Sequence, residues 1–204
     1  KKLLYRSSTS SSLQINKKDI STGKFKFNPF TKQLVDTTLL ALNSFLTNTY
    51  FFNRSNVKWG FDVTHGLSNG KTLLSYGFES RKVRNLFGKA RWNLSKNIST
   101  TVNFRQSKNE LNTSGTKFNN RNYLILQNSV EPSVAYIYKS NFRLSLAYNF
   151  SDKKNTIDSL EKAITHSLIA DVRYNILNNS TLNAKITFNQ INFKAYPGAA
   201  NTTV

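Results

Sequence analysis

The chain has two histidines, His65 and His166, and their positions argue against a metal site. They stand about a hundred residues apart, and neither belongs to an HExxH pattern. The carboxylates form no cluster in the sequence. The chain has no cysteine, which excludes thiolate ligands and a disulfide framework. We therefore expect no metal site and no bound cofactor.

Acyl hydrolysis is the other chemistry that His166 could support, as the base of a Ser–His pair. Such a site needs the serine within hydrogen-bond reach of the histidine and a third group that orients the imidazole. Ser167 follows His166 directly, so in a strand it points to the opposite face. No flanking motif resembles such an enzyme. We expect His166 to be an interfacial residue and the chain to have no catalytic residues.

The net charge is +19, from 29 Lys and Arg against 10 Asp and Glu. Three interpretations compete: binding of nucleic acid, a basic surface or lumen that faces anionic lipid or solute, and lysines that only solvate loops. An OB-like nucleic-acid module exposes its aromatic residues beside a basic groove. Here the aromatic residues share the same rows as Leu, Ile and Val, which favours burial or lipid contact. No glycine-rich phosphate loop is present, so we do not expect nucleic acid as a partner.

Strands must position these residues, because apolar residues recur with a period of two nearly throughout. Residues 142–151 show this most clearly: Phe142, Leu144, Leu146, Tyr148 and Phe150 alternate with polar or small residues. The pattern predicts ten strands: 3–16, 36–52, 57–65, 71–80, 85–95, 97–106, 121–138, 142–151, 164–176 and 181–193. Residues 17–35 are predicted to form an irregular turn or a short extra strand.

Membrane-spanning helices are excluded by the sequence. The longest apolar candidate, residues 39–46, contains Asn43 and Ser44, and a spanning helix needs about 20 mostly apolar residues. Mean hydropathy is −0.46. The strands of a membrane barrel need only alternate, so this composition is compatible with one.

The connections predict sidedness. Short turns are expected at 95–97, 139–141 and 177–180, and long polar loops at 106–120 and 152–163. By alternation, 66–70 falls on the short-turn side, and 53–56 and 80–84 fall on the long-loop side. Outer-membrane barrels show this alternation, with short periplasmic turns and longer extracellular loops.

The alternation also assigns three sets of residues to the two faces and the ends of the strands. Six basic residues are expected to face the lumen: Lys89, Arg91, Arg105, Arg143, Arg173 and Lys185. Four apolar residues are expected to face lipid: Leu144, Leu146, Leu168 and Val172. Interfacial aromatic residues are expected near long loops, at Trp59 and Phe104, and near tight turns, at Trp92, Tyr136, Tyr138, Phe142 and Tyr174. The lumen is either open and anion-selective, or plugged, with these cations paired to Asp62, Glu79 and Asp171.

Two segments resemble barrel strands of large outer-membrane proteins of Bacteroidota: NRSNVKWGFD at 53–62 and EPSVAY at 131–136. The Asn- and Lys-rich strands between Asp36 and Phe193 add to the likeness. Such proteins typically pair a periplasmic region with a C-terminal barrel that closes on an aromatic residue. The resemblance implies that residues 1–204 are a single barrel domain or a barrel segment. We expect truncation at both ends, since the chain contains no methionine and residues 199–204 contain no aromatic.

The sequence therefore predicts an all-β protein, an antiparallel transmembrane β-barrel or a large part of one. We expect it in the bacterial outer membrane, as a non-catalytic, porin-like channel, a transporter or a membrane anchor. Its expected partners are outer-membrane lipid and lipopolysaccharide, and other subunits or the rest of a larger barrel chain. The alternative is a soluble, secreted all-β binding module of the adhesin or carbohydrate-binding type, whose shorter strands also alternate.

Overall fold

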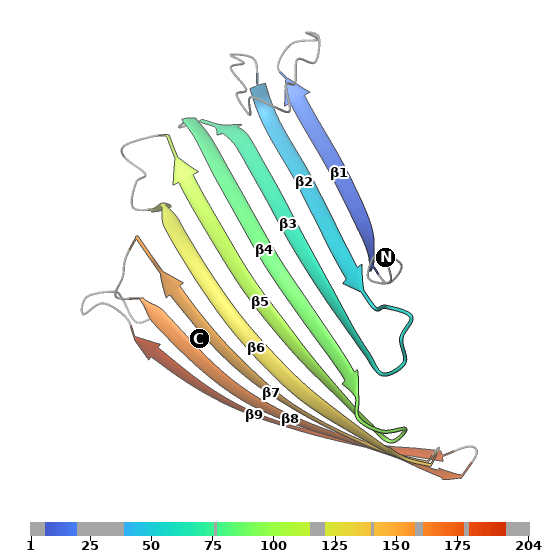
Figure 1. Cartoon of the computed structure of the whole chain (residues 1–204). Helices are drawn as coiled ribbons and strands as arrows, with labels where there is room; N and C mark the ends of the chain where they lie inside the picture. Colours follow the sequence, from blue (N-terminus) through green and yellow to red (C-terminus); the bar gives the residue numbers. More distant parts are fainter. Residues whose placement is uncertain are drawn as a thin grey trace.

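A computed structural model describes residues 7–19, 39–75, 77–114, 121–139, 141–157, 161–177 and 180–194. In these ranges the chain forms one antiparallel sheet of nine strands that pair in chain order (Figure 1). The strands are β1 (Ser7–Asp19), β2 (Leu39–Phe52), β3 (Trp59–Leu74), β4 (Gly77–Asn93), β5 (Ile98–Thr113), β6 (Tyr123–Tyr138), β7 (Phe142–Asn155), β8 (Lys162–Leu177) and β9 (Ser180–Lys194). The prediction of an all-β, antiparallel fold is confirmed.

The sheet is open within the described residues. Figure 1 shows one twisted, bent sheet with β1 at one edge and β9 at the other. Each edge strand pairs with a single neighbour, so a closed barrel is not seen in this part of the chain. The described residues include no helix of the length and apolarity needed to cross a membrane.

Two of the predicted connections are wrong. Residues 66–70 lie inside β3, and residues 80–84 lie inside β4, so nine strands replace the predicted ten. The Gly-Leu-Ser-Asn-Gly segment was expected to turn because glycine, serine and asparagine favour turns. It stays extended because it pairs without interruption with β2 on one side and β4 on the other. At Gly70 the missing side chain lets the backbone lie close to the neighbouring strand, since a Cβ there would sit 3.1 Å from Asn43 Oδ1.

The predicted alternation of short and long connections is also wrong in part. Residues 53–58 form a six-residue connection at the same end of the sheet as the tight turns at 94–97 and 139–141. At the opposite end, β3 ends at Leu74 and β4 begins at Gly77, whose φ is +120°. The connections between β5 and β6 and between β7 and β8 do share that opposite end, as predicted. Of the segment 17–35, residues 17–19 belong to β1, and the rest lies outside the described residues.

The hairpins are staggered across the sheet. Each hairpin at this end of the sheet extends three residues further along the register than the hairpin before it. The shift is seen in the innermost pairs: Phe52–Phe61, Asn93–Ser99, Tyr138–Phe142 and Leu177–Ser180. For example, Phe61 is level with Ala90, three residues before Asn93. Three residues per hairpin is an offset of about 1.5 residues per strand. A strand rises by ~3.3 Å per residue and neighbouring strands lie ~4.8 Å apart. The strands are therefore tilted by roughly 45° from the normal to the plane that contains the hairpin ends. Closed barrels require a tilt of about 35–45°.

Candidate functional site

The two faces of the sheet differ in composition and in exposure. Large apolar side chains on one face, here called the apolar face, are exposed: Val102 is 43%, Val134 45%, Leu146 45% and Leu168 51% accessible. Among the described hydrophobic residues only Leu42 and Leu111 are buried. On the opposite, polar face, side chains such as those of Asn103, Glu131 and Asn149 are partly covered. A soluble antiparallel sheet instead packs its apolar face on a core.

One end of the apolar face carries aromatic residues. Trp59 and Trp92 lie directly opposite each other at the tight-turn end of β3 and β4, and both are exposed. Tyr138, Phe142 and Tyr174 form a second cross-strand row at the tight-turn end of β6, β7 and β8. Tyr136 lies on the same face, one row further from the turn.

The predicted positions of two aromatic residues are wrong. Trp59 lies at the tight-turn end instead of the long-loop end, because residues 66–70 do not form a turn and the parity of the first strands shifts. Phe104 lies near the middle of β5, because that strand continues to Thr113 instead of ending near residue 106. Apart from Phe104, the aromatic residues predicted at strand ends gather at one end of the apolar face.

The apolar face forms a band between this aromatic end and the first charged residues. Along one face, eight residues separate Trp92 from Arg84 in β4, and ten separate Phe142 from Asp152 in β7. Ten residues span roughly 33 Å along a strand. At a tilt of about 45°, the band is roughly 19 Å high at β4 and roughly 23 Å high at β7.

The four residues predicted to face lipid all lie on this band. Leu144 pairs with Val172, while Leu146 lies opposite Ala170 and Leu168 lies opposite Tyr148. Leu146 and Leu168 are about half exposed. The structure thus brings the four residues together on adjacent strands.

The six predicted basic residues all lie on the polar face, from β4 to β9. Arg143 and Arg173 are direct cross-strand neighbours, Lys89 lies opposite Asp62, and Lys185 lies opposite Asp171. The ion pairs found among the described residues involve other cations: Arg121 with Glu79 at 3.5 Å, and Lys162 with Asp152 at 3.3 Å.

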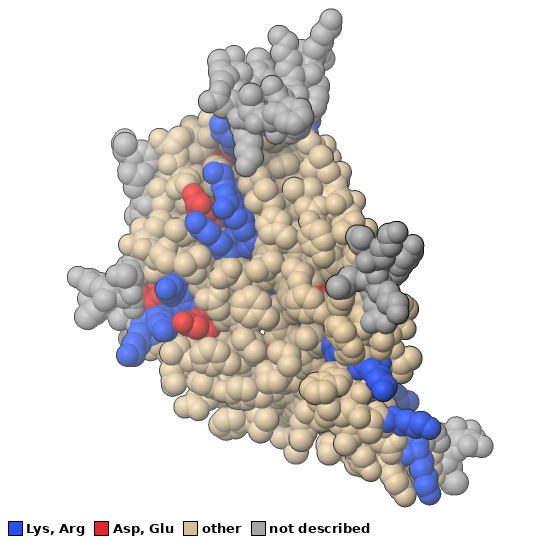
Figure 2. All heavy atoms as spheres, in the orientation of Figure 1, with Lys and Arg blue, Asp and Glu red and all other residues tan. Residues whose placement is uncertain are grey.

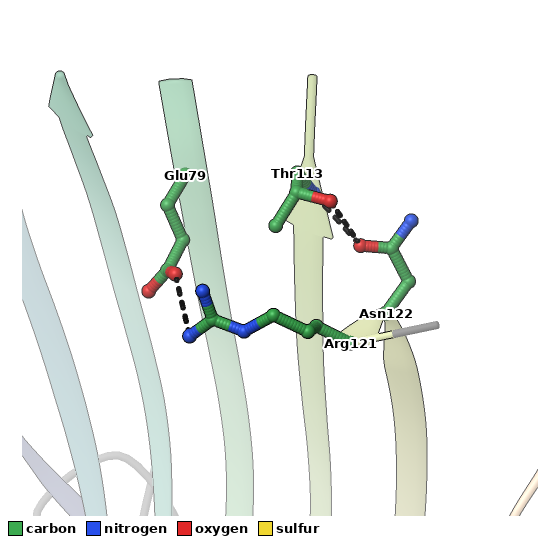
Figure 3. A network of polar contacts seen from close by, with 4 residues as sticks. All are labelled: Glu79, Thr113, Arg121 and Asn122. Carbon is green, nitrogen blue, oxygen red and sulfur yellow. Dashed lines mark hydrogen bonds and ion pairs between the residues drawn. The ribbon is translucent and has the colours of Figure 1, made fainter. Parts of the chain in front are cut away.

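The Glu79–Arg121 pair belongs to a network at the long-loop end. Figure 3 shows Arg121, just before β6, reaching across β5 to Glu79 on β4. Beside it, the backbone N–H and the hydroxyl of Thr113 both donate to Asn122 Oδ1, at 2.8 and 2.9 Å. These contacts tie the residues on either side of the β5–β6 connection to the sheet.

A polar pocket of about 220 Å³ lies on the polar face across β4 to β7. At its centre the Glu131 carboxylate accepts hydrogen bonds from the side-chain amides of Asn103 (3.1 Å) and Asn149 (3.3 Å). The carbonyl oxygens of both amides are buried and have no hydrogen-bond partner among the described residues. Arg105 also lines the pocket. The arrangement offers both acceptors and a cationic donor to a polar solute.

Sequence reasoning did not single out Glu131, Asn103 or Asn149. Alternation places them on the polar row of their strands, but only the register shows that they are neighbours. Asn103 lies opposite Glu131 in the β5–β6 ladder, while Asn149 contacts Glu131 from β7.

The turn between β2 and β3 is held by side-chain hydrogen bonds. Asn53 adopts a positive φ of 59° and donates from its amide to the carbonyl of Trp59 at 3.0 Å. Arg91, on β4, donates to the carbonyls of Arg54 (3.1 Å) and Asn56 (2.9 Å). Arg91 therefore holds this turn through contacts that the sequence did not predict.

His166 lies on the apolar face and hydrogen-bonds through Nδ1 to the Tyr148 hydroxyl, at 2.7 Å. Ser167 lies on the other face and donates to Asn189 at 2.6 Å. His65 lies on β3, well separated in the sheet from His166 on β8. The part of the chain that the structure describes contains no group of three or more His, Asp or Glu that could hold a metal ion.

No family model, curated protein or solved structure matches this chain. The resemblance to outer-membrane proteins of Bacteroidota therefore stays a prediction.

Proposed function

We propose that this chain forms part of a transmembrane β-barrel in a bacterial outer membrane and acts there as a non-catalytic channel, transporter or membrane anchor. The observation that carries this proposal is the exposed apolar face together with the partly covered polar face. Soluble monomers rarely expose contiguous apolar patches beyond a few hundred Å². A lipid bilayer removes this penalty, because it is the apolar solvent that such a face requires.

The dimensions of the band support lipid as that solvent. Its height of roughly 19–23 Å is close to the apolar band of about 25 Å on outer-membrane barrels, whose strands tilt by 35–45°. The exposed Trp59, Trp92 and Tyr138 mark one edge of the band, where an apolar ring with a polar tip suits the headgroup region. The charged residues begin at the other edge.

Closure of the barrel requires strands beside β1 and β9. Each edge strand has one neighbour among the described residues, and an unpaired backbone group in hydrocarbon costs several kcal/mol. We infer that the rest of a larger barrel chain, or other subunits, supplies the missing pairing. The polar face then lines the interior, where its basic residues would favour anionic solutes.

Membrane retention and gel migration test this proposal. The chain, exported in a Gram-negative host together with the strands or subunits that complete its barrel, should stay in the membrane pellet after an alkaline carbonate wash. A detergent extract should migrate differently before and after boiling, because a folded barrel resists the detergent. Release into the wash together with unchanged migration would contradict the proposal and favour a soluble, secreted binding module.

A further inference from the structure

Basic residues form a line on the apolar face, beyond its apolar band. One register row crosses β4 to β9 through Arg84, Lys108, Leu126, Lys154, Lys162 and Lys194. We call the five cations of this row the cationic row. Figure 2 shows the apolar face, with Lys and Arg gathered toward the margins and a wide uncharged area between them.

The cationic row places like charges next to one another. Arg84 lies directly opposite Lys108, and Lys162 lies between Lys154 and Lys194. Opposed side chains on one face of an antiparallel pair have Cβ atoms about 4.5–5.5 Å apart, and like charges there destabilise the pairing. Such an arrangement is stable only when an anion lies between the cations or when water and salt screen them.

Acidic side chains offset only part of this charge. Asp152 forms an ion pair with Lys162 at 3.3 Å, and Glu110 lies opposite Lys82, one position beyond Arg84 on the same face. Arg84 and Lys108 form no ion pair among the described residues. Lys154 and Lys194 form none there either, so four of the five cations of the row have no ion-pair partner among the described residues.

Arg84 and Lys108 also lie nearest to the apolar band. Each is nine residues from the innermost pair of its hairpin, Asn93 with Ser99, whereas Lys162 is fifteen residues from Leu177. Nine residues at a rise of ~3.3 Å and a tilt of about 45° correspond to a height of roughly 21 Å. That height is the edge of the hydrocarbon, where lipid headgroups begin.

The two ends of the apolar face differ. At the tight-turn end, the strand residues of this face are aromatic, such as Trp59, Trp92 and Tyr174. At the long-loop end of β4 to β9 this face carries the cationic row, with the acidic residues Glu110 and Asp152 beside it. A ligand for the cationic end must carry negative charge and stand at the surface of the leaflet on the long-loop side.

We propose that Arg84 and Lys108 bind the phosphate groups of a phosphorylated glycolipid in the outer leaflet, with the rest of the cationic row binding further phosphates. A phosphate accepts several charge-assisted hydrogen bonds, and the fork of Arg84 suits it in a bidentate geometry. The acyl chains of such a lipid would lie against the exposed band below. The inference rests on the proposed membrane location and names the lipid class that this face binds.

Binding of lipid A by the full chain in neutral detergent tests the inference. The double variant Arg84→Gln, Lys108→Gln should bind diphosphoryl lipid A roughly 30-fold more weakly than the wild type, because each cation near an anionic surface contributes about fivefold. The control variant Arg81→Gln, Lys153→Gln removes the same charge at the same end of β4 and β7 but on the polar face. It should bind like the wild type. Dephosphorylated lipid A should bind weakly to all three proteins.

Three outcomes would overturn the inference: equal loss of affinity in both variants, no loss in either, or displacement of lipid A by millimolar inorganic phosphate. The last result would show a site for free anions instead of lipid. Membrane retention separates these failures from failure of the proposed function. A wild-type protein that stays in the membrane, with the double variant binding lipid A normally, contradicts the lipid site alone.

Discussion

Leu146→Arg should strongly destabilise the protein in a bilayer. Leu146 stands four residues from Phe142 and six from Asp152 on the apolar face of β7, so it lies near the middle of the band. A cation at the midplane of a barrel costs about 2–4 kcal/mol, against about 0–1 kcal/mol near the interfaces. Since every 1.4 kcal/mol is a factor of ten, the folding equilibrium constant should fall roughly 30- to 700-fold.

Ser145→Arg is the matched control, one residue away on the polar face. Ser145 lies opposite Asp171 on β8, and an opposite-charge cross-strand pair contributes about 0.2–1 kcal/mol. The cost at this position should therefore stay below about 1 kcal/mol. Urea-dependent unfolding in lipid vesicles, followed by the fluorescence of Trp59 and Trp92, measures both variants. Similar costs at positions 145 and 146 would refute the assignment of lipid to the apolar face.

Two further predictions concern the turn and the polar face. Gly60→Ala should lower the free energy of unfolding by about 1–3 kcal/mol, because the new Cβ would lie 2.9 Å from Arg91 Nη2 and displace the guanidinium from two carbonyls. Gly88→Ala, where the nearest atom is 3.9 Å away, should leave the urea midpoint nearly unchanged; a drop as large as that at Gly60 would contradict the steric argument. Replacing both Arg143 and Arg173 with Glu should weaken or invert anion preference in reversal potentials of the reconstituted barrel, and cation selectivity in the unmodified barrel would rule out an anion-selective interior.

The alternation of side chains was predictable because it is a local property. Period two follows from the pleat of a single strand, whatever its neighbours are. The residues assigned to lipid, such as Leu146 and Leu168, and those assigned to the interior, such as Arg143 and Arg173, therefore fall on opposite faces as predicted. Membrane contact itself stays a prediction.

The strands around residues 66–70 could not be predicted in the same way, because turn signals there compete with pairing that is not local. Gly66 and Gly70 read as a turn, yet each has partners on both sides, in β2 and β4. That pairing joins segments far apart in sequence, and only the structure shows it. The pocket around Glu131 was missed for the same reason, since its residues come from separate strands.

One row of cross-strand neighbours changes from leucines to cations along its length, and the tilt of the strands explains where the change occurs. The row that carries Arg84 and Lys108 continues into β3, β2 and β1 through Leu67, Leu46 and Leu13. The pairing of the strands alone does not explain why this row changes from leucines to cations between β3 and β4. The stagger of the hairpins explains this change. The row lies six residues from the innermost hairpin pair at Leu67 but nine residues from the innermost pair at Arg84. A plane inclined to the rows therefore separates apolar from charged residues, as a flat bilayer crossing tilted strands requires.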